Sequence, residues 1–251
     1  MKPICRLLFL LLAPAALGFA GPPPPARAQE GLWLAWGACA MDPAGSRDQA
    51  FDCASNDGRQ ALYAAFALAQ PLDSVLAVEV VVDLQVAGGA LPDWWQIGSV
   101  GCRGGALGAD ASFGGSPGCA DPWVGGAVVS LPSYTIGMPR GMPGQARIRV
   151  GVGVAANQPR ALAAGTPYHA VRLLISDVRT DSCGGCATPA CLVLNSVLVK
   201  RSPGALGGDV LVIAPGPGDG NRATWQGAGA DCTAVPVRRR ATWGAVKSLY
   251  R

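Results

Sequence analysis

The sequence predicts an all-β protein, an antiparallel β-sandwich of the jelly-roll or immunoglobulin-like kind that is stapled by disulfides. Apolar and polar residues alternate over several stretches, of which 78–86 and 146–154 are the longest. The 35 glycines and 21 prolines gather in clusters between such stretches, which is typical of turns. Short strands separated by turns, together with an even set of cysteines behind an export leader, favour a cross-linked sandwich.

The individual strands follow from the period of the apolar residues. Segments 78–86, 146–154 and 171–175 place apolar side chains at every second position, so each has one core face and one wet face. Further β-rich segments are 192–199 and 210–213, with weaker candidates at 32–36, 128–136 and 223–226. Segment 59–70 is ambiguous because it is rich in alanine, a helix former. We expect a strand there, paired as a hairpin with 73–86.

The N-terminus has the features of a signal peptide over residues 1–28. Lys2 and Arg6 precede an apolar run that is too short to span a bilayer, and Ala26 and Ala28 are small residues at a cleavage spacing. A retained membrane anchor is the less favoured alternative. We therefore expect a secreted, periplasmic or outer-surface protein with no transmembrane segment after cleavage.

The mature chain is expected to form a single domain over 29–251 with little net charge. Removal of the leader takes three basic residues and no acid from a chain whose formal net charge is +4. A nearly neutral protein has no electrostatic reason to bind nucleic acid. The C-terminal segment carries Trp243, Val246 and Leu249 at helical spacing, which predicts a short tail that docks on the body.

The mature cysteines predict up to four disulfides. They are Cys39, Cys53, Cys102, Cys119, Cys183, Cys186, Cys191 and Cys232. Spacing favours local pairs, Cys39 with Cys53 and Cys102 with Cys119, and leaves Cys232 for one cysteine of the 183–191 group. A zinc site at Cys183 and Cys186 is the alternative, disfavoured by an oxidising compartment.

The single histidine, His169, limits the available chemistry. It excludes multi-histidine metal sites and, with the cysteines in disulfides, mixed zinc sites. A Ser–His–Asp triad is less favoured than a hydrogen-bonded core histidine, placed by alternation on the face of Val171 and Leu173. No cofactor is expected. Calcium is a weak alternative, drawn from acidic and amide residues in loops at Asp42, Asp48, Asp52, Asp57, Asp219 and Asn221.

Carboxylate catalysis is the enzymatic alternative. Glu79 and Asp83 share one strand face, and two carboxyl groups are what glycoside hydrolysis requires. Acids at this spacing are more often the polar half of a solvent-facing strand.

The tryptophans are the main functional lead. Trp94 and Trp95 follow a strand, and adjacent residues of an extended chain face opposite ways, so one indole is expected to point outward. We select Trp94, Trp95 and Trp123 as candidate ligand-binding residues, because an exposed indole can stack on a sugar ring. Packing of these tryptophans in the core is the more frequent alternative.

Several motifs resemble uncharacterised exported β-rich proteins of Gram-negative bacteria. They are the 242–251 ending, T-W-G-A-V-K-S-L-Y-R, the V-V-V-D-L-Q strand with L-P-D-W-W, and C-G-G-C with C-L-V-L-N. The resemblance implies an envelope or extracellular location and no known activity. The sequence thus predicts a non-catalytic exported sandwich with a binding or structural role, with a polysaccharide or an envelope protein as partner. The alternative is a carboxylate-dependent glycan hydrolase.

Overall fold

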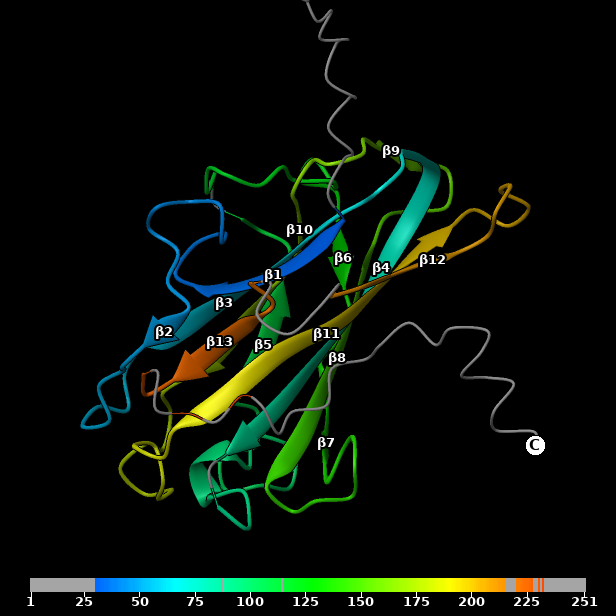
Figure 1. Cartoon of the computed structure of the whole chain (residues 1–251). Coiled ribbons are helices and arrows are strands. Elements are labelled where there is room, and N and C mark those ends of the chain that lie inside the picture. Colours follow the sequence, from blue (N-terminus) through cyan, green and yellow to red (C-terminus); the bar gives the residue numbers. More distant parts are fainter. Residues whose placement is uncertain are drawn as a thin grey trace, which may run out of the picture.

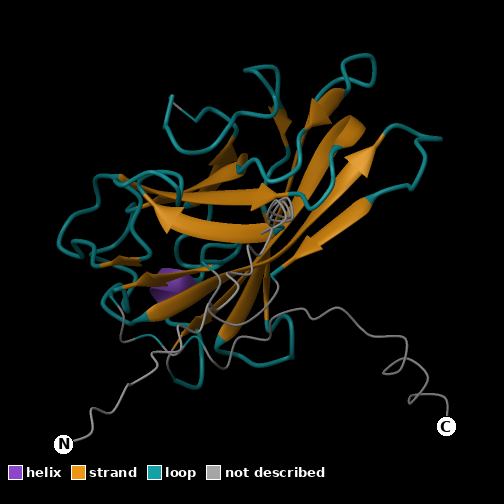
Figure 2. Ribbon diagram, turned by 45° about the horizontal axis from the view of Figure 1, so that its top comes forward, coloured by secondary structure: helices purple, strands orange, loops and turns teal. Residues whose placement is uncertain are grey.

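The structure, a computed structural model, describes residues 30–86, 88–113, 115–214, 220–227, 230 and 232. Strands account for nearly all its regular structure, apart from one 3-10 turn, η1 (Asp93–Trp95) (Figure 2). The first strands are β1 (Gly31–Trp36), β2 (Asp48–Gln49), β3 (Arg59–Ala67), β4 (Leu72–Val86), β5 (Leu107–Asp110), β6 (Val128–Val129) and β7 (Ser133–Ile136). The later strands are β8 (Gln145–Gly153), β9 (Arg160–Leu162), β10 (Tyr168–Ser176), β11 (Ala190–Arg201), β12 (Val210–Ile213) and β13 (Arg222–Trp225).

The strands form two sheets (Figure 1). The small sheet has the order β1-β3-β10-β5, and the large sheet has β2-β13-β11-β4-β8-β6, with β12, β7 and β9 paired to β11, β8 and β4. Among these strand pairs, only β13 with β2 is parallel. The predicted antiparallel, all-β class is confirmed.

The core lies between the two sheets, as a sandwich requires. Apolar residues at alternate positions face it from both sides, because each strand buries one face. The small sheet contributes Leu32, Leu34, Leu62, Phe66 and Leu173, and the large sheet contributes Val80, Val82, Ile148, Val150 and Leu192, all at most 2% exposed. The alternation in 78–86 and 146–154 therefore indicated the correct inward faces.

The ambiguous segment 59–70 contains a strand, β3, as expected, but its predicted hairpin with 73–86 is wrong. β3 pairs with β1 and β10, whereas β4 pairs with β11 and β8 in the other sheet. The chain crosses between the sheets at residues 68–71. Sequential strands are often neighbours, but a sandwich also needs connections of this kind.

All eight cysteines among the described residues form disulfides, and most pairs join distant segments. The pairs are Cys39–Cys119, Cys53–Cys186, Cys102–Cys183 and Cys191–Cys232. The two local pairs predicted from spacing are wrong, because the topology brings other partners closer. The predicted link of Cys232 to the 183–191 group is present. Four disulfides fit an extracellular or periplasmic protein.

Trp94, Trp95 and Trp123 are buried, each 0% exposed, so the expectation of an outward indole is wrong. The reason for the first two is η1: the chain turns there and is not extended, so adjacent side chains no longer face opposite ways. Trp94 and Trp95 instead contact Trp225, with ring centroids 4.4 and 5.6 Å away. Together with Trp36 and Phe51 these rings form the Trp225 cluster.

Asp83 is also buried, although alternation placed it on a wet face. Arg147 binds it in a bidentate manner, with Nε and Nη2 at 2.6 and 2.8 Å, and Asn195 Nδ2 donates to the same carboxylate. Opposite Asp83 in the register lies Val193, which packs with Cys191, Ala230 and Cys232. The disulfide at Cys191 therefore covers part of this outer face.

The leader at 1–28 and the docking tail around Trp243 lie outside the described residues, so the signal peptide and the single domain over 29–251 stay predictions. The same applies to the C-terminal element that carries the family resemblance. Among the described residues, no helix has the length and apolar character needed to cross a membrane.

Candidate functional site on the outer face of the small sheet

Two pockets lie beside the face of the small sheet that points away from the core, and the larger one extends past the β5 edge to Val129 of β6. The register of β3 places Ala65 opposite Trp33 of β1 and opposite His169 of β10. Residues directly opposite each other on neighbouring strands point to the same face. Trp33 and His169 therefore lie on one surface, on either side of Ala65.

His169 reaches this surface because β10 contains a bulge. The register shifts between His169 and Val171, which pair with the consecutive residues Ala65 and Ala64. Because Ala170 is an extra residue in the register, the side chains of β10 before it lie on the opposite face from the one that simple alternation assigns. The prediction that His169 shares the face of Val171 is therefore wrong.

Two loops that are joined by the Cys39–Cys119 disulfide cover the middle of this face. Their backbones touch: a Cβ on Gly118 would lie 2.7 Å from the Asp42 nitrogen, so only glycine fits there, and its φ is +90°. The Ser116 hydroxyl braces the contact, since it accepts from Cys39 N–H at 3.3 Å and lies 3.5 Å from the Asp42 carboxylate. Ala65 and Ala67 of β3 are buried although they lie on this outer face.

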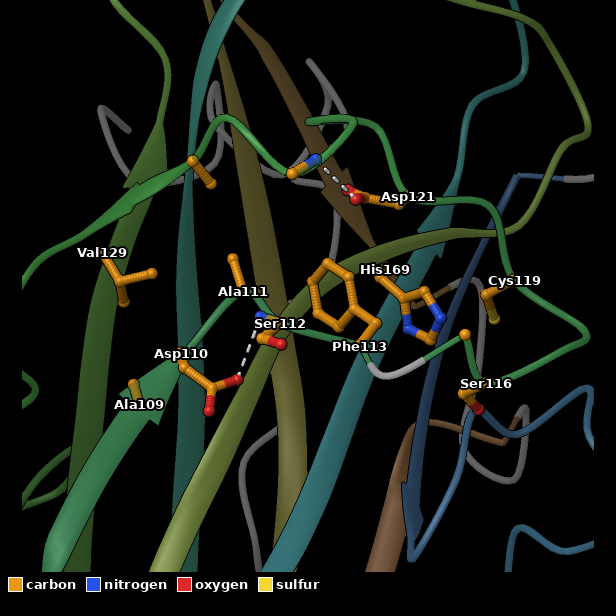
Figure 3. A pocket seen from close by; sticks show the side chains of 13 residues that line it. Ala109, Asp110, Ala111, Ser112, Phe113, Ser116, Cys119, Asp121, Val129 and His169 are labelled. Carbon is orange, nitrogen blue, oxygen red and sulfur yellow. Dashed lines mark hydrogen bonds between the residues drawn. The ribbon is translucent and has the colours of Figure 1, made fainter.

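The larger cavity, the His169 pocket, has a volume of about 660 Å³. Its lining includes Asp110, Ser112, Phe113, Ser116, Asp121 and His169. The His169 ring stacks on Phe113, with centroids 4.2 Å apart and planes 7° from parallel. Figure 3 shows this stack, with Cys119 and Ser116 beside the imidazole.

His169 is 1% exposed, and neither ring nitrogen makes a well-aligned hydrogen bond among the described residues. The predicted core histidine is thus buried, with the Ser116 backbone as a weak hydrogen-bonding neighbour. Burial lowers the pKa of His169, and the hydrogen bond with the Ser116 backbone and the charge of Asp121 oppose that shift. Burial therefore favours the neutral imidazole. No serine hydroxyl pairs with it among the described residues, so the structure lends no support to a triad.

Both carboxylates of the His169 pocket already have partners. Asp110 accepts two hydrogen bonds from Arg172, at 2.9 and 2.6 Å, and Asp121 accepts from the backbone N–H groups of Trp123 and Gly125. Both carboxylates of this pocket are therefore occupied by donors of the protein itself.

The second cavity, the Trp33 pocket, has a volume of about 320 Å³ and is also lined by Met41, Arg47 and Gly220. Trp33 is half-buried, and it is the one described tryptophan that is not buried. Its indole packs against glycine backbone, because a Cβ on Gly31 or Gly220 would lie 2.5 or 2.6 Å from the ring. Sequence reasoning missed Trp33, although glycines at 31 and 220 are consistent with a flat aromatic contact.

The calcium alternative gains no support. Asp42 and Asp52 each accept a hydrogen bond from the backbone N–H two residues later, as turn residues do. Asp219 lies outside the described residues. Within the described ranges, the one group of three close His, Cys, Asp or Glu side chains is Cys39, Cys119 and His169.

Comparisons with known proteins give no family. No protein-family model and no curated protein matches the chain. Among solved structures, a cohesin module from a family 33 glycoside hydrolase of Clostridium perfringens is similar at 8% sequence identity. The match covers 78% of this chain and 94% of the module, with a TM-score of 0.29. A score this low carries no argument about function.

Proposed function

We propose that this protein is a non-catalytic, exported β-sandwich module that binds a glycan in the Trp33 pocket. The observation that supports it is the half-buried indole of Trp33, held in the wall of a pocket that also contains Arg47. An indole face binds the apolar face of a sugar ring, and a guanidinium donates to hydroxyl or carboxylate oxygens. An envelope protein as partner remains the alternative ligand of the same surface.

The orientation of Trp33 is built into the fold. Gly31 and Trp33 are two residues apart on β1, so their side-chain positions share a face. Gly220 lies along the free edge of β1, where its carbonyl accepts a hydrogen bond from Leu34 N–H at 2.9 Å. Both glycines therefore support the ring without filling the pocket.

A carboxylate-dependent hydrolase has weaker support. The acids of the His169 pocket are held by Arg172 and by backbone amides, and Asp83 is buried in its own ion pair. Retaining and inverting glycosidases both need one carboxyl group that carries a proton.

The test is a fluorescence titration of the oxidised mature protein with soluble polysaccharides and peptidoglycan fragments. A Trp243→Phe background removes the one indole outside the described residues. We expect a saturable spectral shift, and an affinity at least about tenfold lower in Trp33→Ala, as for loss of an aromatic anchor. Gly31→Ala should weaken binding as well, because its Cβ would displace the indole.

The matched control is Leu131→Ala, which removes an exposed apolar side chain between β6 and β7 of the large sheet. It should leave the titration unchanged. No shift with any glycan, or a shift that survives Trp33→Ala, would refute the proposal.

A further inference from the structure

The Cys39–Cys119 disulfide lies beside the buried imidazole of His169. The two sulfur atoms and a ring nitrogen of His169 all lie within 4.8 Å of one another. Cys39 is 0% and His169 1% exposed, and neither nitrogen of the ring makes a well-aligned hydrogen bond within the described residues. A buried imidazole of this kind calls for an explanation, and ligation of a metal ion in another state of the protein is one.

We propose that Cys39, Cys119 and His169 form a zinc site that exists only when their disulfide is reduced. Two thiolates and one imidazole are a donor set that suits Zn²⁺. With three protein ligands, the fourth tetrahedral position is open to water from the His169 pocket. This inference is independent of glycan binding, which concerns the Trp33 pocket.

The fold holds the three ligands together without help from the disulfide. His169 is fixed on β10 and stacks on Phe113. Cys39 follows β1, and its N–H donates to Ser116 of the loop that carries Cys119. The ligand atoms therefore stay near one another when the S–S bond opens.

The reductant is a dithiol. One of its thiolates attacks Cys119, the half-buried sulfur that lines the His169 pocket, and breaks the S–S bond. The second thiolate of the reductant then displaces Cys119 and closes the reductant's own disulfide. Two electrons and two protons pass to Cys39 and Cys119. Binding of Zn²⁺ releases the two thiol protons to solvent and leaves neutral His169 as the third ligand.

The first test titrates the oxidised protein with a dithiol in the presence of Co²⁺, a spectroscopic substitute for Zn²⁺. Free thiols are alkylated at each stage and identified by peptide mass spectrometry. We expect a thiolate-to-cobalt charge-transfer band and the visible bands of tetrahedral Co²⁺ to grow as Cys39–Cys119 opens. The bands should be absent in Cys39→Ser/Cys119→Ser.

The matched control for the imidazole is His169→Phe, which keeps a ring against Phe113 and loses the ligand. It should lower the affinity for Zn²⁺ by at least about tenfold and leave the glycan titration unchanged.

A second variant avoids reduction of the other three disulfides. Cys39→His leaves those disulfides intact and frees the Cys119 thiol beside two imidazoles. It should bind one Co²⁺ without any reductant. The proposal is overturned if Cys39–Cys119 opens without metal binding, if binding persists in the double serine variant, or if folded Cys39→His binds no Co²⁺.

Discussion

The Trp225 cluster and the outer face of the small sheet differ in how their rings are packed. In the cluster, the rings contact one another, and the indole N–H groups of Trp36, Trp94 and Trp225 donate to oxygens at 2.7 to 3.2 Å, while Trp95 Nε1 has no partner among the described residues. On the outer face, buried His169 and half-buried Trp33 each line a pocket. The first region is arranged for stability, and the second leaves rings beside open space, as sites for ligands do.

The largest expected effect tests the aromatic half of this comparison. Trp225 is 0% exposed and contacts four other aromatic rings, so Trp225→Ala should lower the free energy of unfolding by about 3–5 kcal/mol. Trp33→Ala, the matched tryptophan of the outer face, should lower it by less than about 1 kcal/mol. Denaturant unfolding measures both. Equal losses would contradict the division between the two regions.

Arg103 contacts the Trp225 cluster and also donates hydrogen bonds to nearby backbone carbonyls. It is 0% exposed, lies 3.7 Å over the Trp94 ring and donates to the carbonyls of Trp94, Val178 and Ser176. Burial lowers its pKa to about 10, against the opposing effect of Asp177, so it stays charged at neutral pH. Arg103→Met leaves three carbonyls without this donor and should cost about 2–4 kcal/mol of stability.

The matched control for Arg103 is Arg172→Met, at a partly exposed pair with Asp110. It should cost about 0–1 kcal/mol, because water screens the interaction. A comparable loss in both variants would show that burial does not determine how much Arg103 contributes to the free energy of unfolding.

The smallest expected effect is a gain. His169→Phe removes a buried imidazole that lacks a well-aligned hydrogen bond, and should raise stability by about 1 kcal/mol at pH 7.5. The pKa of His169 is lower in the folded protein than its ordinary value of 6.5, so protonation favours the unfolded chain. The wild type should therefore lose stability as the pH falls through about 6.5, and the variant should lose less. Parallel pH profiles would contradict this assignment.

The sequence predicted the parts of the fold in which a single rule, the alternation of buried and exposed side chains, decides the structure. Strands β4 and β8 have one buried face, so simple alternation located them and their inward residues. β3 is covered on both faces, by the core and by loops, so its alanines carry no alternation. Asp83 was misplaced for a similar reason, since a disulfide-linked segment covers its face.

The candidate site was less predictable because it depends on local irregularities and long-range contacts. The bulge at Ala170 turns His169 to the outer face, and η1 turns Trp94 and Trp95 inward; neither leaves a clear pattern in the sequence. Spacing misassigned Cys39 and Cys119 because a sandwich brings together residues that are 80 positions apart.

The order of the cysteines along the chain has a consequence for biosynthesis. Three of the four native pairs span 80, 133 and 81 residues and skip intervening cysteines; only Cys191–Cys232 joins consecutive ones. The N-terminal end of the chain is made first, so Cys39 can pair with Cys53 long before Cys119 is available. An oxidase that joins cysteines in order of appearance would thus trap the wrong isomers. With such an oxidase, we expect maturation to depend on a disulfide isomerase that reshuffles these bonds, and its supply would limit the yield of native protein.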